Sequence, residues 1–193
     1  MADERSDEAL MLAYRDGDAA AFDALYARWR SRLYRYILHQ CGERGLAEDL
    51  YQDVWMKLIG ARGNYEIHAK FSTWLFTIAH RRLIDHYRRS AARPQEVVRW
   101  QDEDDAGDPL DELPGPSALE PLQQHATGEL RTRLLDALGA LPAAQREAFL
   151  LVEEGDLSLD DAARAAGVGR ETLKSRLRYA LAKLRAALVE FKS

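Results

Sequence analysis

The C-terminal third of the chain carries side chains of the kind that bind nucleic acid. Residues 162–193 include 8 Lys or Arg and 2 Glu, a local charge of 8 − 2 = +6 within a chain of net charge −5. Guanidinium and ammonium groups hydrogen-bond to phosphate oxygens and to guanine edges in the major groove. The segment therefore predicts duplex DNA binding. An amphipathic helix with a solvated basic face is the alternative for this segment taken alone.

The residues around this charge have the spacing of a helix-turn-helix. Ser158 followed by Asp161 fits the capping signal of a helix start, and Gly167 stands where a tight turn needs a positive φ. The second helix then carries leucines at spacings of 4, 4, 3 and 4, which form one apolar stripe: Leu173, Leu177, Leu181, Leu184 and Leu188.

Two further clusters could do chemistry in the N-terminal half. Aromatic and basic side chains are mixed at Tyr65, Lys70, Phe71, Trp74, His80, Arg81, Arg88 and Arg89. Such a mixture can stack unpaired bases beside a positive track, although core anchoring is the commoner role of aromatics. Asp49, Gln52 and Asp53 form an acidic helix face, which is either solvated or docks on a basic helix of a partner.

The elements that would position these side chains are helices. Helical periodicity is visible at 7–15, 20–41, 47–59 and 71–89, and β-branched residues are few, so we expect an all-α fold. The lone Cys41 excludes an intrachain disulfide and a multi-cysteine zinc site. The acidic N-terminus lacks a signal-peptide pattern and no apolar run is long enough to span a membrane, so we expect a cytoplasmic protein without membrane insertion.

Residues 95–127 differ in composition from the rest. They hold nine acidic residues against one basic residue, together with several Pro and Gly. Such a stretch breaks helices and repels itself, which predicts a flexible acidic linker between two small helical domains at 1–94 and 128–193. It is either a solubilising loop or a segment that follows a basic channel or screens basic surfaces until a partner arrives.

Four runs, in order, resemble the extracytoplasmic-function (ECF) group of bacterial sigma-70-type RNA polymerase sigma factors. GDAAAFDALYARWRSRLYRYI at 17–37 resembles region 2.1 and AEDLYQDVWMKL at 47–58 resembles region 2.2. FSTWLFTIAHRRLIDHYRR at 71–89 resembles regions 2.3–2.4, and 141–188 resembles region 4. The resemblance covers both expected domains and leaves only the linker and termini unmatched.

The resemblance implies a promoter-recognition subunit with no catalysis of its own and no cofactor. It implies binding to core RNA polymerase at the β′ coiled coil and the β flap, binding to promoter DNA, and inhibition by an anti-sigma factor. The positions matching the polymerase-binding helix are Asp49, Gln52 and Asp53. The positions matching the −10 contacts are Lys70, Phe71, Ser72, Trp74, His80, Arg81, Asp85 and Arg88. The positions matching the −35 contacts are Arg170, Glu171, Thr172, Lys174, Ser175, Arg178 and Tyr179.

Three positions depart from the family pattern or allow another role. Asp156 stands where relatives often have Gly, and Glu171 where they have Gly or a small residue. Asp85 has a structural alternative, which is pairing with Arg81 and Arg89 one helical turn away.

Two other classes of function remain as alternatives. A free-standing DNA-binding regulator would share the helix-turn-helix but would bind duplex DNA without the polymerase. An enzyme is poorly supported, because His80, Asp85 and His86 do not share one helix face and no nucleophile or phosphate-loop motif is present.

Overall fold

The computed structural model describes residues 4–90 and 121–189, and within these ranges the chain is helical with no strand. The predicted all-α fold is therefore confirmed. The N-terminal elements are α1 (Asp7–Arg15), α2 (Ala19–Cys41), α3 (Arg44–Ala61), the 3₁₀ turn η1 (Arg62–Asn64) and α4 (Phe71–Ser90). The C-terminal elements are α5 (Pro121–Gly139), α6 (Ala143–Glu153), α7 (Leu159–Ala166) and α8 (Arg170–Val189).

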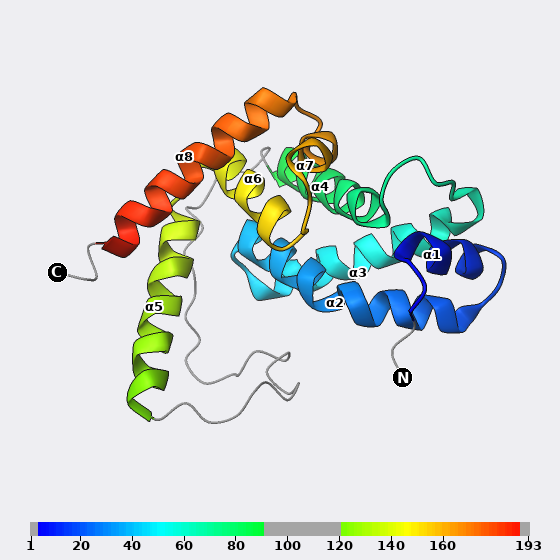
Figure 1. The fold of residues 1–193 in the computed structure, drawn as a ribbon, viewed down its shortest axis with the longest axis horizontal. Coiled ribbons are helices and arrows are strands. Elements are labelled where there is room, and N and C mark those ends of the chain that lie inside the picture. The colour runs from blue at the N-terminus through cyan, green and yellow to red at the C-terminus, as the bar shows by residue number, and fades with distance from the viewer. Residues whose placement is uncertain (1–3, 91–120, 190–193) are drawn as a thin grey trace.

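The two groups of helices meet along α2 and α4. Figure 1 shows α2, α3 and α4 packed together, with α6 and α7 lying against them and α5 and α8 extending away on the far side. Helix α5 begins at Pro121, so the last part of the predicted linker, 95–127, is helical. The earlier part of that range lies outside the described residues, and so do the acidic side chains on which the linker prediction depends. None of the described helices has the length and apolar character needed to cross a membrane.

The N-terminal helices share a dense core of aliphatic and aromatic side chains. Leu25, Leu33 and Phe76 have no accessible surface, and the ring of Trp29 lies 6.1 Å from that of Phe76. Asp18 caps the start of α2 through a side chain that accepts from the Ala21 amide, and a left-handed Gly42 caps its end. Both ends of α2 thus satisfy their backbone groups locally, and the core fixes α4 against α2.

Helix α1 holds the start of α4 and the loop before it. The backbone N–H of Phe71, the first residue of α4, donates to Glu8 Oε1 at 2.7 Å. Arg15 donates to the Tyr65 carbonyl oxygen at 3.2 Å, and Arg62 donates to the Tyr14 hydroxyl at 3.2 Å. The short first helix therefore fixes both sides of the loop between α3 and α4.

The predicted helix-turn-helix is confirmed in its caps and its turn. Ser158 Oγ accepts from the Asp161 amide at 3.2 Å, and Gly167 adopts a left-handed φ of 65°. Asp156 also adopts a positive φ, 51°, which explains why glycine suits this position. Of the predicted leucine stripe on α8, Leu173 and Leu184 are buried, while Leu177 and the remaining leucines are half-buried.

Candidate nucleic-acid interface

A pocket of about 370 Å³ lies between the loop before α4 and the first turns of α4. Its wall includes the flat ring of Trp74 and, 4.9 Å away between centroids, the ring of Tyr65. The Thr73 hydroxyl lies in the same wall, is buried, and has no hydrogen-bond partner among the described residues. The residues lining the pocket are Ala61, Asn64, Tyr65, Glu66, His68, Ala69, Thr73, Trp74, Thr77, Arg81 and Arg164.

The polar groups of this pocket can hydrogen-bond to a ligand. Burial, together with the nearby carboxylates of Glu8 and Asp7, raises the pKa of Tyr65 to about 12. The Tyr65 hydroxyl is therefore protonated at neutral pH, and like that of Thr73 it is buried without a partner in the described part of the chain. A cavity whose wall carries two adjoining aromatic rings suits a flat ligand.

Only part of the predicted −10 set lies where DNA can reach it. Trp74 and Arg81 line the pocket, Lys70 is exposed at its edge, and Asp85 and Arg88 are exposed further along α4.

Phe71 and Ser72 do not lie on the surface. Phe71 has no accessible surface because its ring packs in the core 6.3 Å from that of Trp29, and Ser72 is 8 % exposed. The structure therefore gives no support to side-chain contacts with DNA from these two residues.

His80 and Asp85 also differ from the sequence-based expectation. His80 Nδ1 contacts Glu147 Oε1, so it faces the C-terminal helices and not solvent. Arg89 donates to the backbone oxygen of Asp85 at 3.1 Å, so this contact is to the peptide and not to the carboxylate. Within the described residues no three His, Cys, Asp or Glu side chains lie close enough to hold a metal ion.

The predicted polymerase-binding residues lie on one exposed face of α3. Asp49 and Gln52 are exposed, and Met56, one turn further on, is 66 % exposed. Asp53 is half-exposed and pairs with Arg82 of α4. The face therefore combines acidic groups with an apolar anchor, and Asp53 has a structural partner that sequence spacing alone did not indicate.

The predicted −35 residues lie on the outer side of α8, and several contact one another. Arg170 Nε is 2.9 Å from Asp160 Oδ1, which connects the start of α8 to α7. Glu171 lies 3.6 Å from Arg170 and 4.0 Å from Lys174. The Arg178 guanidinium lies 5.1 Å from the centre of the Tyr179 ring. Thr172 is exposed and Ser175 is half-buried.

Comparison with known proteins assigns the family. The family models that match are sigma-70 region 2, over residues 25–93, and sigma-70 region 4, over residues 131–184. The ECF RNA polymerase sigma factor SigK of Mycobacterium tuberculosis (strain ATCC 25618 / H37Rv) is 30 % identical over 183 residues, which are 94 % of this chain and 92 % of that relative. This chain belongs to the ECF sigma factors of the sigma-70 family. It is a promoter-specific transcription initiation factor, in a family whose members are not enzymes in general.

Other relatives of this sigma factor agree with the assignment. SigK of Mycobacterium sp. (strain KMS) is 28 % identical over 177 residues, 89 % of this chain and 84 % of the relative. The sigma factor RpoE from Bartonella quintana, solved in complex with the anti-sigma factor NepR, is 27 % identical to this chain, with a TM-score of 0.62. The match covers 86 % of this chain and 96 % of the RpoE chain. CnrH, solved in complex with the cytosolic domain of CnrY, shares the fold with a TM-score of 0.67 at 22 % identity. The match covers 98 % of this chain and 100 % of the CnrH chain.

The structure also adds residues that the sequence analysis did not single out. Thr73 and Thr77 line the pocket from α4, and Arg164 reaches it from α7. Glu8 and Arg15 hold the loop from α1. The only signal in the sequence was the glycine- and asparagine-rich composition of the loop itself, because contacts over 50 or more residues leave no local pattern.

Proposed function

We propose that this sigma factor divides promoter recognition among three surfaces. The outer side of α8 reads the −35 element, the pocket at the start of α4 holds an unstacked base of the −10 element, and the exposed face of α3 binds core RNA polymerase. The observation that carries the proposal is the pocket, since it has an aromatic wall and lies in the part of the chain that matches region 2.

The pocket suits a single nucleobase. Base flipping costs a few kcal/mol, and stacking on an aromatic ring returns about 1–3 kcal/mol per base. Trp74 offers the ring, and Tyr65 and Thr73, whose buried hydroxyls have no partner among the described residues, belong to the same wall. Lys70, which directly precedes α4, and Arg81, in the middle of α4, are both exposed and supply positive charge for the adjoining phosphates. Phe71 and Ser72 support this site from within the fold.

The α8 surface suits the major groove of a duplex. Lys174 and Arg178 are exposed one helical turn apart and can reach guanine edges. Glu171 contacts Arg170 and Lys174, so its carboxylate limits how freely those cations move. A carboxylate can also accept from cytosine N4, which makes Glu171 a candidate for base preference.

The α3 surface and the C-terminal helices account for the protein partners. Asp49 and Gln52 lie one to two turns before the exposed Met56 on α3, a combination that fits a basic helical partner such as the β′ coiled coil. The C-terminal domain is expected to contact the β flap. An anti-sigma factor is a further partner, as for the Bartonella relative. These partners place the protein in the bacterial cytoplasm.

Two substitutions separate polymerase binding from melting. Asp49→Arg should abolish co-purification with core polymerase, whereas Asp23→Arg, an equal charge reversal at an exposed position of α2, should not. Trp74→Ala should retain core binding. It should lower the equilibrium constant for unstacking of a 2-aminopurine base in a −10 strand by about 5- to 150-fold, which corresponds to the stacking free energy of one base. Trp74→Phe should restore part of the signal. Normal melting by the alanine variant would contradict the pocket assignment.

A further inference from the structure

We propose that Glu171 and Lys174 of α8 together read a single G·C base pair of the −35 element, with the cytosine at Glu171 and the guanine at Lys174. The inference rests on the function proposed above for the outer side of α8. It deepens that function because it names one base pair and the two side chains that select it. It also gives a role to Glu171, a position at which this chain departs from the family pattern.

Glu171 lies on the side of α8 that faces away from the core. Leu173 and Leu184 are buried on the opposite side of the helix. Glu171, Lys174 and Arg178 are exposed, and their spacings of three and four residues place them on one face of the helix. The outermost side of α8 therefore carries a carboxylate in its first turn and cations in the turns that follow.

The carboxylate and the first of these cations lie side by side. Glu171 Oε2 is 4.0 Å from Lys174 Nζ, and the two side chains are 78 % and 60 % exposed. An ion pair between groups as exposed as these contributes little to stability, so both groups can exchange one another for a base edge at small cost. The pair thus presents one hydrogen-bond acceptor and one donor next to each other.

This order of acceptor and donor matches the major-groove edge of a G·C pair. Guanine presents two acceptors, N7 and O6, beside the N4 donor of cytosine. The ammonium can donate to the guanine acceptors while the carboxylate accepts from cytosine N4. In an A·T pair the N6 donor lies between two acceptors, adenine N7 and thymine O4, so a carboxylate that approaches N6 is repelled from both sides. The chemistry of the pair therefore favours G·C over A·T.

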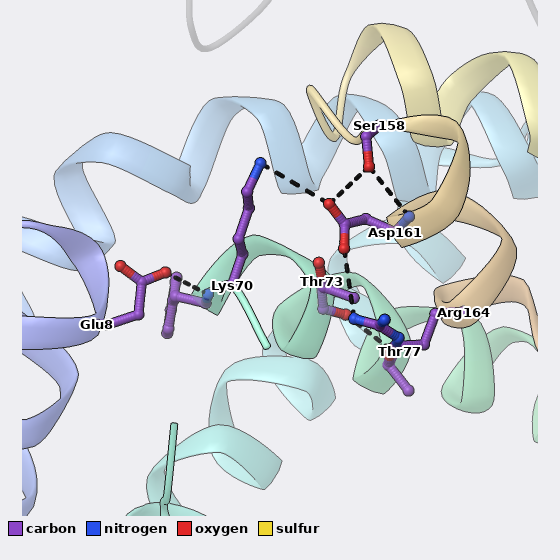
Figure 2. Close-up of polar contacts among 8 residues, drawn as sticks. Glu8, Lys70, Thr73, Thr77, Ser158, Asp161 and Arg164 are labelled. Atoms are coloured by element: carbon purple, nitrogen blue, oxygen red, sulfur yellow. Dashed lines mark hydrogen bonds and ion pairs between the residues drawn. The ribbon is translucent and has the colours of Figure 1, made fainter. Parts of the chain in front are cut away.

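The two carboxylates at the start of α7 already have partners within the chain. Figure 2 shows Asp161 directed toward Ser158, whose hydroxyl donates to Asp161 Oδ2 at 2.7 Å. Asp160 Oδ1 lies 2.9 Å from Arg170 Nε. Glu171 Oε1 is 3.6 Å from Arg170 Nη1, a separation too long for a hydrogen bond. Glu171 is therefore the carboxylate of this region that remains able to accept from a base.

The carboxylate acts on unsuitable sequences as well as on the suitable one. If guanine or thymine stands opposite Glu171, the carboxylate meets acceptors only, and the phosphates repel it whatever the sequence. The resulting selectivity comes from repulsion of the wrong bases together with one favourable contact. We expect it to amount to about a tenfold preference for G·C at this position.

The experiment uses holoenzyme reconstituted from the full chain and bacterial core RNA polymerase. The template is a barcoded promoter library with a randomised −35 element and a −10 element from which the parent holoenzyme transcribes. The abundance of each barcode among the transcripts gives the preference for every base pair at every position. The variants are Glu171→Gly, Glu171→Gln and Lys174→Ala. Glu153→Gln, at an exposed position of α6, is the control that removes the same charge from the same domain.

The variants should change the preference at one base pair and leave the others as they are. Glu171→Gly should remove the preference for cytosine at this position. Glu171→Gln should move it toward adenine, because a glutamine side chain pairs with adenine N6 and N7. Lys174→Ala should weaken the preference for guanine in the same base pair. Glu153→Gln should retain every preference of the parent.

Three results would overturn the proposal. The first is a Glu171→Gly holoenzyme that keeps every preference of the parent. The second is a gain in transcription that is uniform over the library and that Glu153→Gln matches, since Glu171 would then act only by general repulsion of DNA. The third is a Lys174→Ala effect at a different base pair from that of Glu171→Gly, which would exclude a shared pair.

The same library distinguishes failure of this inference from failure of the proposed function. A parent holoenzyme that needs the −10 element but has no preference within the −35 element would refute the function proposed for α8, and the inference with it. A parent holoenzyme whose −35 preferences are unaffected by substitution of Glu171 would refute the inference alone.

Discussion

Replacing Glu8 tests the role of α1 in fixing α4. Glu8 Oε1 accepts from the Phe71 amide at 2.7 Å, although the two residues are 63 positions apart. Phe71 has no accessible surface, so water is poorly placed to substitute for the lost acceptor. Capping substitutions cost about 0.5–2 kcal/mol, and hydrogen bonds to charged groups contribute about 1.5–3 kcal/mol. We therefore expect Glu8→Ala to lower the free energy of unfolding by about 2 kcal/mol.

Glu8→Gln separates the charge from the hydrogen bond. The amide oxygen still accepts, so only the interaction of the carboxylate with the helix N-terminus is lost, and we expect a decrease of about 0.3–1 kcal/mol. Urea unfolding followed by tryptophan fluorescence measures both, because Trp29, Trp55 and Trp74 all lie in the N-terminal helices. Glu48→Ala, at an exposed position of α3, serves as the control. If Glu8→Ala unfolds at the same urea concentration as Glu48→Ala, the capping argument is refuted.

Three further predictions concern stability and DNA binding. Burial raises the pKa of Tyr87 to about 12, so the phenol ionises at a lower pH in the unfolded chain than in the folded protein. The free energy of unfolding therefore keeps the contribution of Tyr87 below about pH 10 and loses it as the pH rises toward 12. Tyr87→Phe should make this decrease less steep in urea titrations. An unchanged slope would contradict it. Asp156 has a φ of 51°, so the Asp156→Gly variant should have a free energy of unfolding about 1 kcal/mol higher than the Asp156→Ala variant. Thermal melts that give the reverse order would contradict this backbone argument. Lys174→Ala should weaken −35 duplex binding by about 1–3 kcal/mol, whereas Lys183→Ala should not; equal losses in a gel-shift titration would remove Lys174 from base recognition.

The helices and their caps were predictable from the sequence because their signals are local. The helix at 7–15 matches α1 residue for residue, and Ser158 and Gly167 occupy the cap and turn positions that the spacing predicts. The leucine spacing of α8 likewise placed Leu173 and Leu184 in the core. Such features depend on neighbours within one or two turns.

The site was predictable only in part because burial depends on distant contacts. Trp74 and Phe71 are both aromatic and three residues apart, yet the first lines the pocket and the second is fully buried against Trp29. Arg164 reaches the same pocket from another domain, and no periodicity in the sequence links it to Trp74. The pairing of Asp53 with Arg82 is similarly invisible to a pattern confined to one helix.

The most direct test of the account is reconstitution of the full chain with bacterial core RNA polymerase, followed by run-off transcription on a promoter library. We expect saturable, stoichiometric binding to core and transcripts that depend on both a −35 and a −10 element. Failure to bind core, together with tight and independent binding of duplex DNA by the protein alone, would contradict the account.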